Sequence, residues 1–144
     1  MPDAAIASPS QRPWGWFETL AEGEGYKLKR LVIRSGQRLS LQRHRHRSEH
    51  WLVAAGCGSV WLEEHQQKLA PGDSVEIPVR CRHRAAAEGP GELVIIELQR
   101  GQLLSEDDIE RFADDYGRCD NTVHCDNTVI SADGVATGDA PDRV

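Results

Sequence analysis

The stretch Gly36-Gln-Arg-Leu-Ser-Leu-Gln-Arg-His-Arg-His-Arg-Ser-Glu-His-Trp-Leu-Val-Ala-Ala-Gly56 holds a glutamine, a histidine and a glutamate in an order that suits a metal ion. Residues two apart on an extended strand share a face, so Gln42 and His44 can point at one spot. Glu49 follows His44 by five residues, which is an odd offset. The polar link 45–48 must therefore turn before Glu49 rejoins that face.

A second stretch, Gly72-Asp-Ser-Val-Glu-Ile-Pro78-Val-Arg-Cys-Arg-His83, indicates a turn, a short strand and a loop that begins at a proline. His83 stands at the end of this loop. An imidazole is a common ligand for transition metals. We therefore expect His83 to offer a fourth ligand beside the first three.

The first stretch resembles the first motif of the cupin family. That motif reads Gly, five residues, His-x-His, three or four residues, Glu, six residues, Gly. The chain fits it, if glutamine replaces the first histidine, with Gly36, Gln42, His44, Glu49 and Gly56. The form Gln-x-His in this place is similar to that of phosphomannose isomerases.

The second stretch resembles the second cupin motif, which reads Gly, five residues, Pro-x-Gly, two residues, His, three residues, Asn. Gly72, Pro78 and His83 match it. The chain departs from the motif at Arg80 and Ala87, where the family has glycine and asparagine. The match at His83 supports its expected role as a ligand.

The resemblance extends from Arg12-Pro-Trp-Gly-Trp-Phe17 to Asp115-Tyr-Gly-Arg118. Over this span the chain resembles the C-terminal isomerase domain of type II mannose-6-phosphate isomerase / mannose-1-phosphate guanylyltransferase. This implies an all-β cupin, a jelly-roll barrel, that interconverts an aldose phosphate and a ketose phosphate in the synthesis of sugar-nucleotide and polysaccharide precursors. No stretch resembles the glycine-rich nucleotide loop of the guanylyltransferase domain, so we do not expect guanylyl transfer by this chain alone.

Two other functions remain open. The chain could be a cupin that acts on another sugar phosphate or on a nucleotide sugar. It could also be a non-catalytic cupin that binds sugars or has a regulatory role, with a separate guanylyltransferase chain as partner. The departures at Arg80 and Ala87 favour these two alternatives over the isomerase.

The expected ligands are Gln42, His44, Glu49 and His83. One neutral oxygen, two imidazoles and one carboxylate suit zinc, iron, manganese, cobalt or nickel and disfavour soft copper(I). We expect one divalent transition metal, with zinc first. A rival set replaces Gln42 and consists of His44, His46, Glu49 or His50, and His83. We prefer Gln42 because only that register also satisfies both glycines of the motif.

An aldose–ketose isomerase needs a base that moves a proton between two carbons of the sugar. Three residues near the motifs could serve, and spacing alone does not distinguish them. They are His50, Glu97 and Lys29.

The formal net charge is −6, but the charges are unevenly placed. Residues 27–47 contain eight lysines or arginines and no acid, whereas the chain from residue 102 onward contains eleven acids and three arginines. Because the basic block flanks both motifs, we expect the phosphate of a sugar phosphate to contact some of its arginines. The candidates are Arg38, Arg47, Arg82 and Arg84. We expect no nucleic acid partner, because the domain is acidic and no aromatic residues interleave the basic ones.

The length of 144 residues suits one domain. We expect a flexible N-terminal arm over residues 1–11, the cupin domain over 12–118 and a disordered tail over 119–144. Short strands separated by Gly and Pro turns are typical of a sandwich or small barrel. One short C-terminal helix is predicted, with Ser105 as N-cap and Asp108 at the third helical position.

The four cysteines show no Cys-x-x-Cys pair, and the sequence has neither a signal peptide pattern nor an apolar run long enough to span a membrane. We therefore expect a cytoplasmic protein with reduced thiols and no membrane contact. Barrels of this kind commonly pair, so we also expect a homodimer.

Overall fold

The computed structural model describes residues 9–118, which form β-strands and contain no helix. The strands are β1 (Ser10–Arg12), β2 (Gly15–Gly23), β3 (Tyr26–Ile33), β4 (Leu41–Arg43), β5 (Arg47–Ala55), β6 (Gly58–Leu62), β7 (His65–Leu69), β8 (Ser74–Ile77), β9 (His83–Ala87), β10 (Leu93–Gly101) and β11 (Glu110–Ala113). With no helix in residues 9–118, none is available there to span a membrane.

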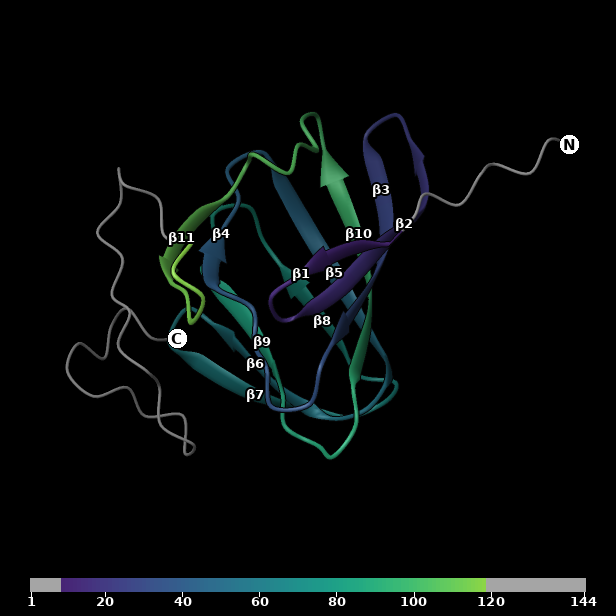
Figure 1. Cartoon of the computed structure of the whole chain (residues 1–144). Helices are drawn as coiled ribbons and strands as arrows, with labels where there is room; N and C mark the ends of the chain where they lie inside the picture. Colours follow the sequence, from purple (N-terminus) through teal and green to yellow (C-terminus); the bar gives the residue numbers. More distant parts are fainter. Residues whose placement is uncertain (1–8, 119–144) are drawn as a thin grey trace, which may run out of the picture.

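The strands form two antiparallel sheets that face each other (Figure 1). Sheet A has six strands in the order β1-β2-β3-β10-β5-β8, and sheet B has five in the order β11-β4-β9-β6-β7. The prediction of an all-β sandwich is confirmed. Ser10 and Gln11 belong to β1, although the sequence placed them in the N-terminal arm. Residues 1–8 and the predicted tail lie outside the described residues.

Strand β10 shows how the core leads into the site. Its inward positions are Leu93, Ile95, Glu97 and Gln99, and all four are buried. Leu93 and Ile95 pack in the hydrophobic core with Trp51. Because successive side chains of a strand alternate between its faces, the same inward row continues from apolar core to polar residues. One face of one strand therefore serves both the core and the site.

Four positions of the cupin motifs have left-handed backbone, namely Gly36, Gly56, Gly72 and Arg80. Gly56 has a φ of 81°, and a Cβ there would lie 2.0 Å from the carbonyl oxygen of Glu92. Only glycine allows this approach. Arg80, which replaces a motif glycine, keeps the left-handed conformation with a φ of 67°. Its N–H donates to the carbonyl oxygen of His44 at 2.8 Å, and this bond holds the loop that leads to His83.

The predicted C-terminal helix is wrong. Residues 105–109 form a turn, and the strand β11 follows and pairs with β4. Ser105 Oγ accepts the N–H of Asp107 at 3.1 Å, and the Ser105 carbonyl oxygen accepts the N–H of Asp108 at 3.1 Å. Serine and aspartate stabilise turns with the same side-chain hydrogen bonds that cap helices. Ser105 therefore makes the hydrogen bonds expected of a capping residue, but they stabilise a turn that precedes the edge strand β11.

Candidate metal centre

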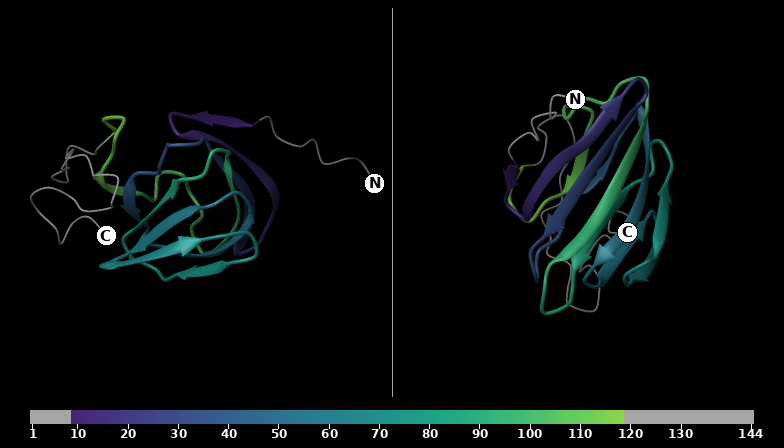
Figure 2. Two further views of the ribbon diagram at one scale, coloured as in Figure 1. Left: turned by 90° about the horizontal axis from the view of Figure 1, so that it is seen from below. Right: turned by 90° about the vertical axis from the view of Figure 1, so that its right-hand side faces the viewer.

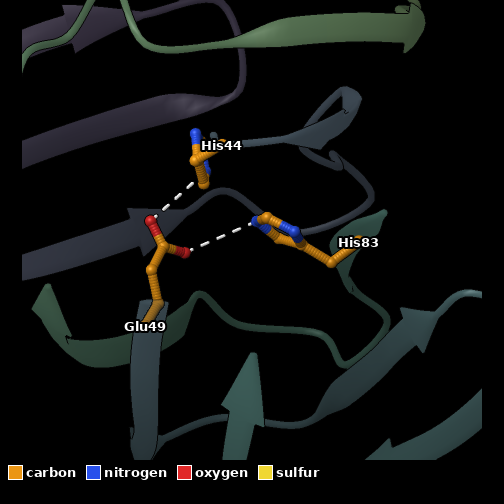
Figure 3. A group of neighbouring side chains, drawn as sticks. All are labelled: His44, Glu49 and His83. Atoms are coloured by element: carbon orange, nitrogen blue, oxygen red, sulfur yellow. Dashed lines mark ion pairs between the residues drawn. The ribbon is translucent and has the colours of Figure 1, made fainter. Parts of the chain in front are cut away.

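Three of the predicted ligands converge where β4 ends and β5 begins. His44 directly follows β4, Glu49 lies on β5 and His83 is the first residue of β9. Their ligand atoms all lie within 4.8 Å of one another, and all three side chains are buried. Figure 3 shows both imidazole rings turned toward the carboxylate. The expected turn between His44 and Glu49 is also present, as a bend at residues 45–46.

The hydrogen bonds of both imidazoles direct Nε2 at Glu49. Nδ1 of His44 lies 2.7 Å from the carbonyl oxygen of Asp108, and Nδ1 of His83 lies 2.9 Å from that of Cys81. A carbonyl oxygen can only accept, so each Nδ1 carries a proton. The Nε2 atoms lie 3.3 and 3.4 Å from the oxygens of Glu49. Two ring nitrogens and a carboxylate thus converge on a point that suits a divalent cation.

The charges at this point also fit a cation. Burial lowers the pKa of His44 to about 4, so its ring is neutral at pH 7. Burial opposes the ionisation of Glu49, but the adjoining His83 and His44 and then the charge of Arg47 outweigh it and hold the pKa of Glu49 well below its usual value. Arg47 Nε donates to Glu49 Oε2 at 2.9 Å, and its Nη2 lies 3.3 Å from His44 Nε2. Arg47 thus orients two of the three ligands.

A cavity of about 100 Å³ adjoins the ligands. Lys29 of β3 and Glu97 of β10 lie directly opposite each other in its wall and are 3% and 5% exposed. The indole Nε1 of Trp51 donates to Glu97 Oε2 at 3.0 Å and to Glu49 Oε1 at 3.2 Å. Burial, and then the negative charge of Glu49, raises the pKa of Glu97 to about 7. The cavity wall therefore carries two ionised carboxylates, those of Glu49 and Glu106, and one, that of Glu97, which titrates near neutrality.

The connection between β10 and β11 covers this end of the cavity, and Figure 1 shows it crossing from one sheet to the other. Glu106 forms an ion pair with Lys29, and the carbonyl oxygen of Ser105 accepts from Arg47 Nη1 at 3.1 Å. The carboxylate of Asp108 accepts two backbone N–H groups of the bend between β4 and β5, each at 2.9 Å. This connection is thus attached to the residues that surround the ligands.

Gln42 lies beside the three ligands. It is directly opposite His83 in the pairing of β4 with β9, and it lines the same cavity. Its Oε1 accepts a hydrogen bond from Ser40 Oγ at 3.3 Å. An amide oxygen has a second lone pair that can reach a cation. Coordination by Gln42 stays a prediction.

His46 and His50 do not reach the cavity, so the rival ligand set is not assembled. His46 is exposed, and His50 Nδ1 forms an ion pair with Glu76 on the outer side of sheet A. Because Glu49 points inward, alternation turns its neighbour His50 outward. The proposal of His50 as a base is therefore wrong, and Glu97 and Lys29 remain.

Of the four arginines expected to bind phosphate, only Arg47 lines the cavity. Arg38 is held on the outside by Asp115, with bonds of 2.6 and 2.8 Å. Its expected role at the site is therefore wrong. The basic block of the sequence is divided between the inside and the outside of the sandwich.

Arg82 and Arg84 are also placed away from the cavity. Arg82 Nε donates to Glu63 at 3.2 Å. Arg84 is fully buried, and its Nε donates to the carbonyl oxygen of Leu39 at 2.9 Å. Both flank His83 in the sequence, and the neighbours of an inward residue on a strand point away from it. Because Arg82 and Arg84 are next to His83 in the sequence, they were expected at the cavity, but strand alternation turns both of them away from it.

Sequence reasoning missed several residues of the cavity wall. Gln99 lies two residues beyond Glu97 on β10, so strand alternation could have placed it there. Arg12 is the first residue of the span over which the chain resembles the isomerase domain, but nothing in its spacing marks it as part of the site. Arg111 and Arg118 line the cavity from β11 and the residues after it. Because a helix was predicted for this segment, the alternation of inward and outward residues along β11, which would have indicated Arg111, was not applied.

Comparisons with known proteins agree with this geometry. Residues 3–114 match the family described as Mannose-6-phosphate isomerase C-terminal. The mannose-1-phosphate guanylyltransferase of Escherichia coli (strain K12) is 41% identical over 109 residues, which are 74% of this chain and 22% of that protein. The alginate biosynthesis protein AlgA of Pseudomonas aeruginosa is 43% identical over 107 residues, with the same shares. The chain thus spans 22% of the length of these curated relatives.

Solved structures share the fold. The capsular polysaccharide assembling protein CapF from Staphylococcus aureus aligns with a TM-score of 0.64 and 16% identity, over 72% of this chain and 33% of that one. A cupin-2 domain protein from Rhodospirillum rubrum aligns with a TM-score of 0.55 and 24% identity, over 65% of this chain and 67% of that one. These likenesses show that the two antiparallel sheets form a cupin fold.

Proposed function

This chain belongs to the mannose-6-phosphate isomerase C-terminal family, and from that premise we propose that it is a metal-dependent isomerase of an aldose phosphate and a ketose phosphate. Mannose 6-phosphate is the proposed aldose, and the synthesis of polysaccharide precursors is the proposed context. One observation carries the proposal. The ligand cluster of His44, Glu49 and His83 adjoins a cavity whose wall holds the buried Lys29 and Glu97.

The three clustered residues would hold one divalent transition metal, with Gln42 as the proposed fourth ligand. Nitrogen and oxygen donors favour zinc first, with iron, manganese, cobalt or nickel as alternatives. When bound, such a metal polarises a sugar carbonyl and its neighbouring hydroxyl. Arg47 and the carbonyl oxygens behind both imidazoles fix the ligands in the orientation that this requires.

We propose Glu97 as the group that moves the proton between the two carbons. A pKa of about 7 lets a carboxylate accept and return a proton near neutral pH. Both of its oxygens are held, because Trp51 donates to Oε2 at 3.0 Å and Gln99 donates to Oε1 at 2.7 Å. Lys29 lies opposite Glu97 and places a positive charge beside it. Lys29 is the second candidate for this step.

We place the substrate phosphate against the arginines that line the cavity. They are Arg12, Arg47, Arg111 and Arg118. Arg12 lies over the Phe17 ring at 4.8 Å, and Arg118 is held by Asp114 with bonds of 2.9 and 3.0 Å. A guanidinium group that is already oriented loses less conformational freedom when it binds a phosphate.

Binding of a sugar phosphate without catalysis is the second candidate, and the departures from the second cupin motif at Arg80 and Ala87 favour it. The cavity of about 100 Å³ is smaller than the roughly 300 Å³ at the lower end of small-molecule sites. A hexose phosphate would therefore extend beyond this cavity, or a lining segment such as the connection that carries Glu106 would have to move. The small volume of the cavity limits the entry of another sugar phosphate or a nucleotide sugar in the same way. It also limits a role in which this chain binds a sugar beside a separate guanylyltransferase chain.

The test is to incubate the metal-loaded protein with mannose 6-phosphate and to measure the formation of fructose 6-phosphate. Glu97→Gln should lower kcat by about 100-fold or more, because proton transfer by a positioned side chain contributes roughly that much. His50→Gln is the matched control and should keep wild-type turnover, since His50 lies outside the cavity. Absence of turnover with each of the five metals would contradict the isomerase, and calorimetry with mannose 6-phosphate would then test the binding candidate.

A further inference from the structure

Gln99 has a buried amide oxygen that no group in the described part of the chain satisfies. The residue points inward from β10, is fully buried and lines the cavity. Its Oε1 has no hydrogen-bond partner among residues 9–118. Buried polar atoms nearly always have such a partner, so each exception needs an explanation. Because Gln99 borders the cavity, a molecule bound there can supply the partner.

The other end of the same amide fixes its orientation. Gln99 Nε2 donates to Glu97 Oε1 at 2.7 Å. An ionised carboxylate has only acceptor oxygens, so a reversed amide would place two acceptors against each other. The nitrogen therefore stays on the side of Glu97, and Oε1 is directed away from that carboxylate. An amide oxygen can only accept, so the group that satisfies Oε1 must be a donor.

Strand pairing places this amide beside both parts of the proposed site. Gln99 lies directly opposite Glu49 of β5, and Glu97 is two residues away on the same face of β10. Figure 2, right, shows β3, β10 and β5 side by side. Residues directly opposite each other on antiparallel strands have Cβ atoms about 4.5 to 5.5 Å apart. Gln99 is thus a neighbour of one metal-ligand candidate and of the proposed proton-transfer group.

The charges around the cavity indicate which kind of donor Oε1 takes. A phosphate dianion offers only acceptor oxygens, so the amide oxygen would repel it, and the arginines of the cavity suit it better. An ammonium group would donate, but Lys29 and Arg47 line the same cavity and would repel a cation. A neutral hydroxyl group donates without either penalty. Gln99 Oε1 therefore fits the hydroxyl-bearing part of a ligand and not its anionic end.

We propose that Gln99 is a specificity-determining residue whose Oε1 accepts a hydrogen bond from the 3-hydroxyl of the sugar phosphate. This inference rests on the proposed function, which supplies the substrate. The first two carbons exchange the proton, and their oxygens face the metal. The 3-hydroxyl is the nearest one that takes no part in that exchange. A ligand that lacks it leaves the buried amide oxygen unsatisfied and is therefore bound less tightly.

The test is calorimetry of the metal-loaded full chain with mannose 6-phosphate and with its 3-deoxy and 4-deoxy analogues. The wild type should bind the 3-deoxy analogue about tenfold more weakly than mannose 6-phosphate. Gln99→Met removes the acceptor in a similar volume and should bind these two ligands with equal affinity. Gln99→Asn withdraws the amide by one methylene and should show the same equality even if Gln99→Met fails to fold. Neither variant should change the relative affinity for the 4-deoxy analogue.

Gln67→Met is the matched control. Gln67 is an exposed glutamine of β7 and does not line the cavity, so this variant should discriminate against the 3-deoxy analogue like the wild type. Discrimination that persists in both Gln99 variants would overturn the proposal and mean that Oε1 accepts from water only. Loss of the metal from Gln99→Met would also overturn it, because the amide oxygen would then be a metal ligand.

A parallel turnover assay separates this inference from the proposed function. Binding of mannose 6-phosphate without turnover would refute the isomerase and leave the comparison of the analogues valid. Turnover by a wild type that binds mannose 6-phosphate and the 3-deoxy analogue equally well would refute the role of Gln99 and support the isomerase. A wild type that does not bind mannose 6-phosphate at all would overturn both.

Discussion

Glu49 and Glu97 are two glutamates on neighbouring strands of sheet A, both buried and both turned inward, yet they differ in charge. Burial alone raises the pKa of each. At Glu49 the contacts with His83 and Arg47 reverse that effect and keep the carboxylate ionised. At Glu97 burial and the charge of Glu49 prevail over Lys29, and the pKa rises to about 7. The partners of a buried carboxylate, rather than its depth, thus decide whether it suits a cation or a proton.

The sharpest way to break this comparison is to neutralise each carboxylate in turn. Glu49→Gln should weaken metal affinity by at least about 100-fold, since changes behind the ligands already cost 10- to 100-fold. Glu97→Gln should keep the metal affinity within about tenfold of that of the wild type, because residue 97 is linked to Glu49 only through the indole of Trp51. Competition with a chelator measures both. Equal losses in the two variants would show that the carboxylates do not have separate roles.

A second test concerns how far the ligand group extends toward β4. If Gln42 is the fourth ligand, Gln42→Ala should lower metal affinity by about 10- to 100-fold or more. Gln42→His should keep or tighten it, because it restores the common His-x-His form. His46→Ala should leave the affinity unchanged, since His46 is exposed. Loss of metal from His46→Ala with full retention in Gln42→Ala would exclude coordination by Gln42.

The pKa of Glu97 predicts a dependence of stability on pH. A carboxyl group whose folded pKa is raised from 4.5 to about 7 binds its proton more tightly in the folded state. Its contribution to stability is therefore complete below pH 4.5 and is lost as the pH rises through 7. Between pH 5 and 7 the loss should be on the order of 2 kcal/mol.

Urea unfolding of chelator-treated protein at a series of pH values measures this loss. Glu97→Gln is the control: the stability of the wild type relative to this variant should fall by that amount between pH 5 and 7, because the amide does not titrate, whereas the opposite contribution of His44, whose pKa is lowered, is common to both proteins. An identical slope in the two proteins would place the pKa of Glu97 near its usual value and remove the contrast with Glu49.

The smallest expected effect concerns Gln99, which is hydrogen-bonded to Glu97 and not to Glu49. Gln99 donates to Glu97 Oε1 at 2.7 Å and thereby lowers the pKa of that group, while its own Oε1 is buried with no hydrogen-bond partner among the described residues. Gln99→Met removes both features in a similar volume. Stability should change by less than about 1 kcal/mol, because a lost hydrogen bond and a removed unpaired oxygen offset each other.

The pH profile is the more specific measurement for this variant. Its midpoint should move to higher pH, and metal affinity should stay at the wild-type value. A midpoint that moves to lower pH would contradict the assigned direction of the bond from Gln99.

The site was predictable where a residue's role follows from its own strand. The period of two puts Gln42 on one face with His44, and the motif spacing brought in Glu49 and His83. The prediction of secondary structure failed at Ser105, because serine and aspartate make the same hydrogen bonds in a turn as at the start of a helix. Whether a strand follows such a turn depends on the free edge of β4, which lies far away in the sequence.

The sequence by itself, through strand alternation and its resemblance to the cupin motifs, determined the all-β fold and three candidate ligands, His44, Glu49 and His83, since both signals depend on residues within each stretch. Only the tertiary structure decided which arginines reach the cavity, because Arg12, Arg47 and Arg111 come from separate strands that pair over long distances. It alone also decided the charge of Glu97. A pKa depends on burial and on charges contributed by other strands, and neither is written in the residues next to Glu97.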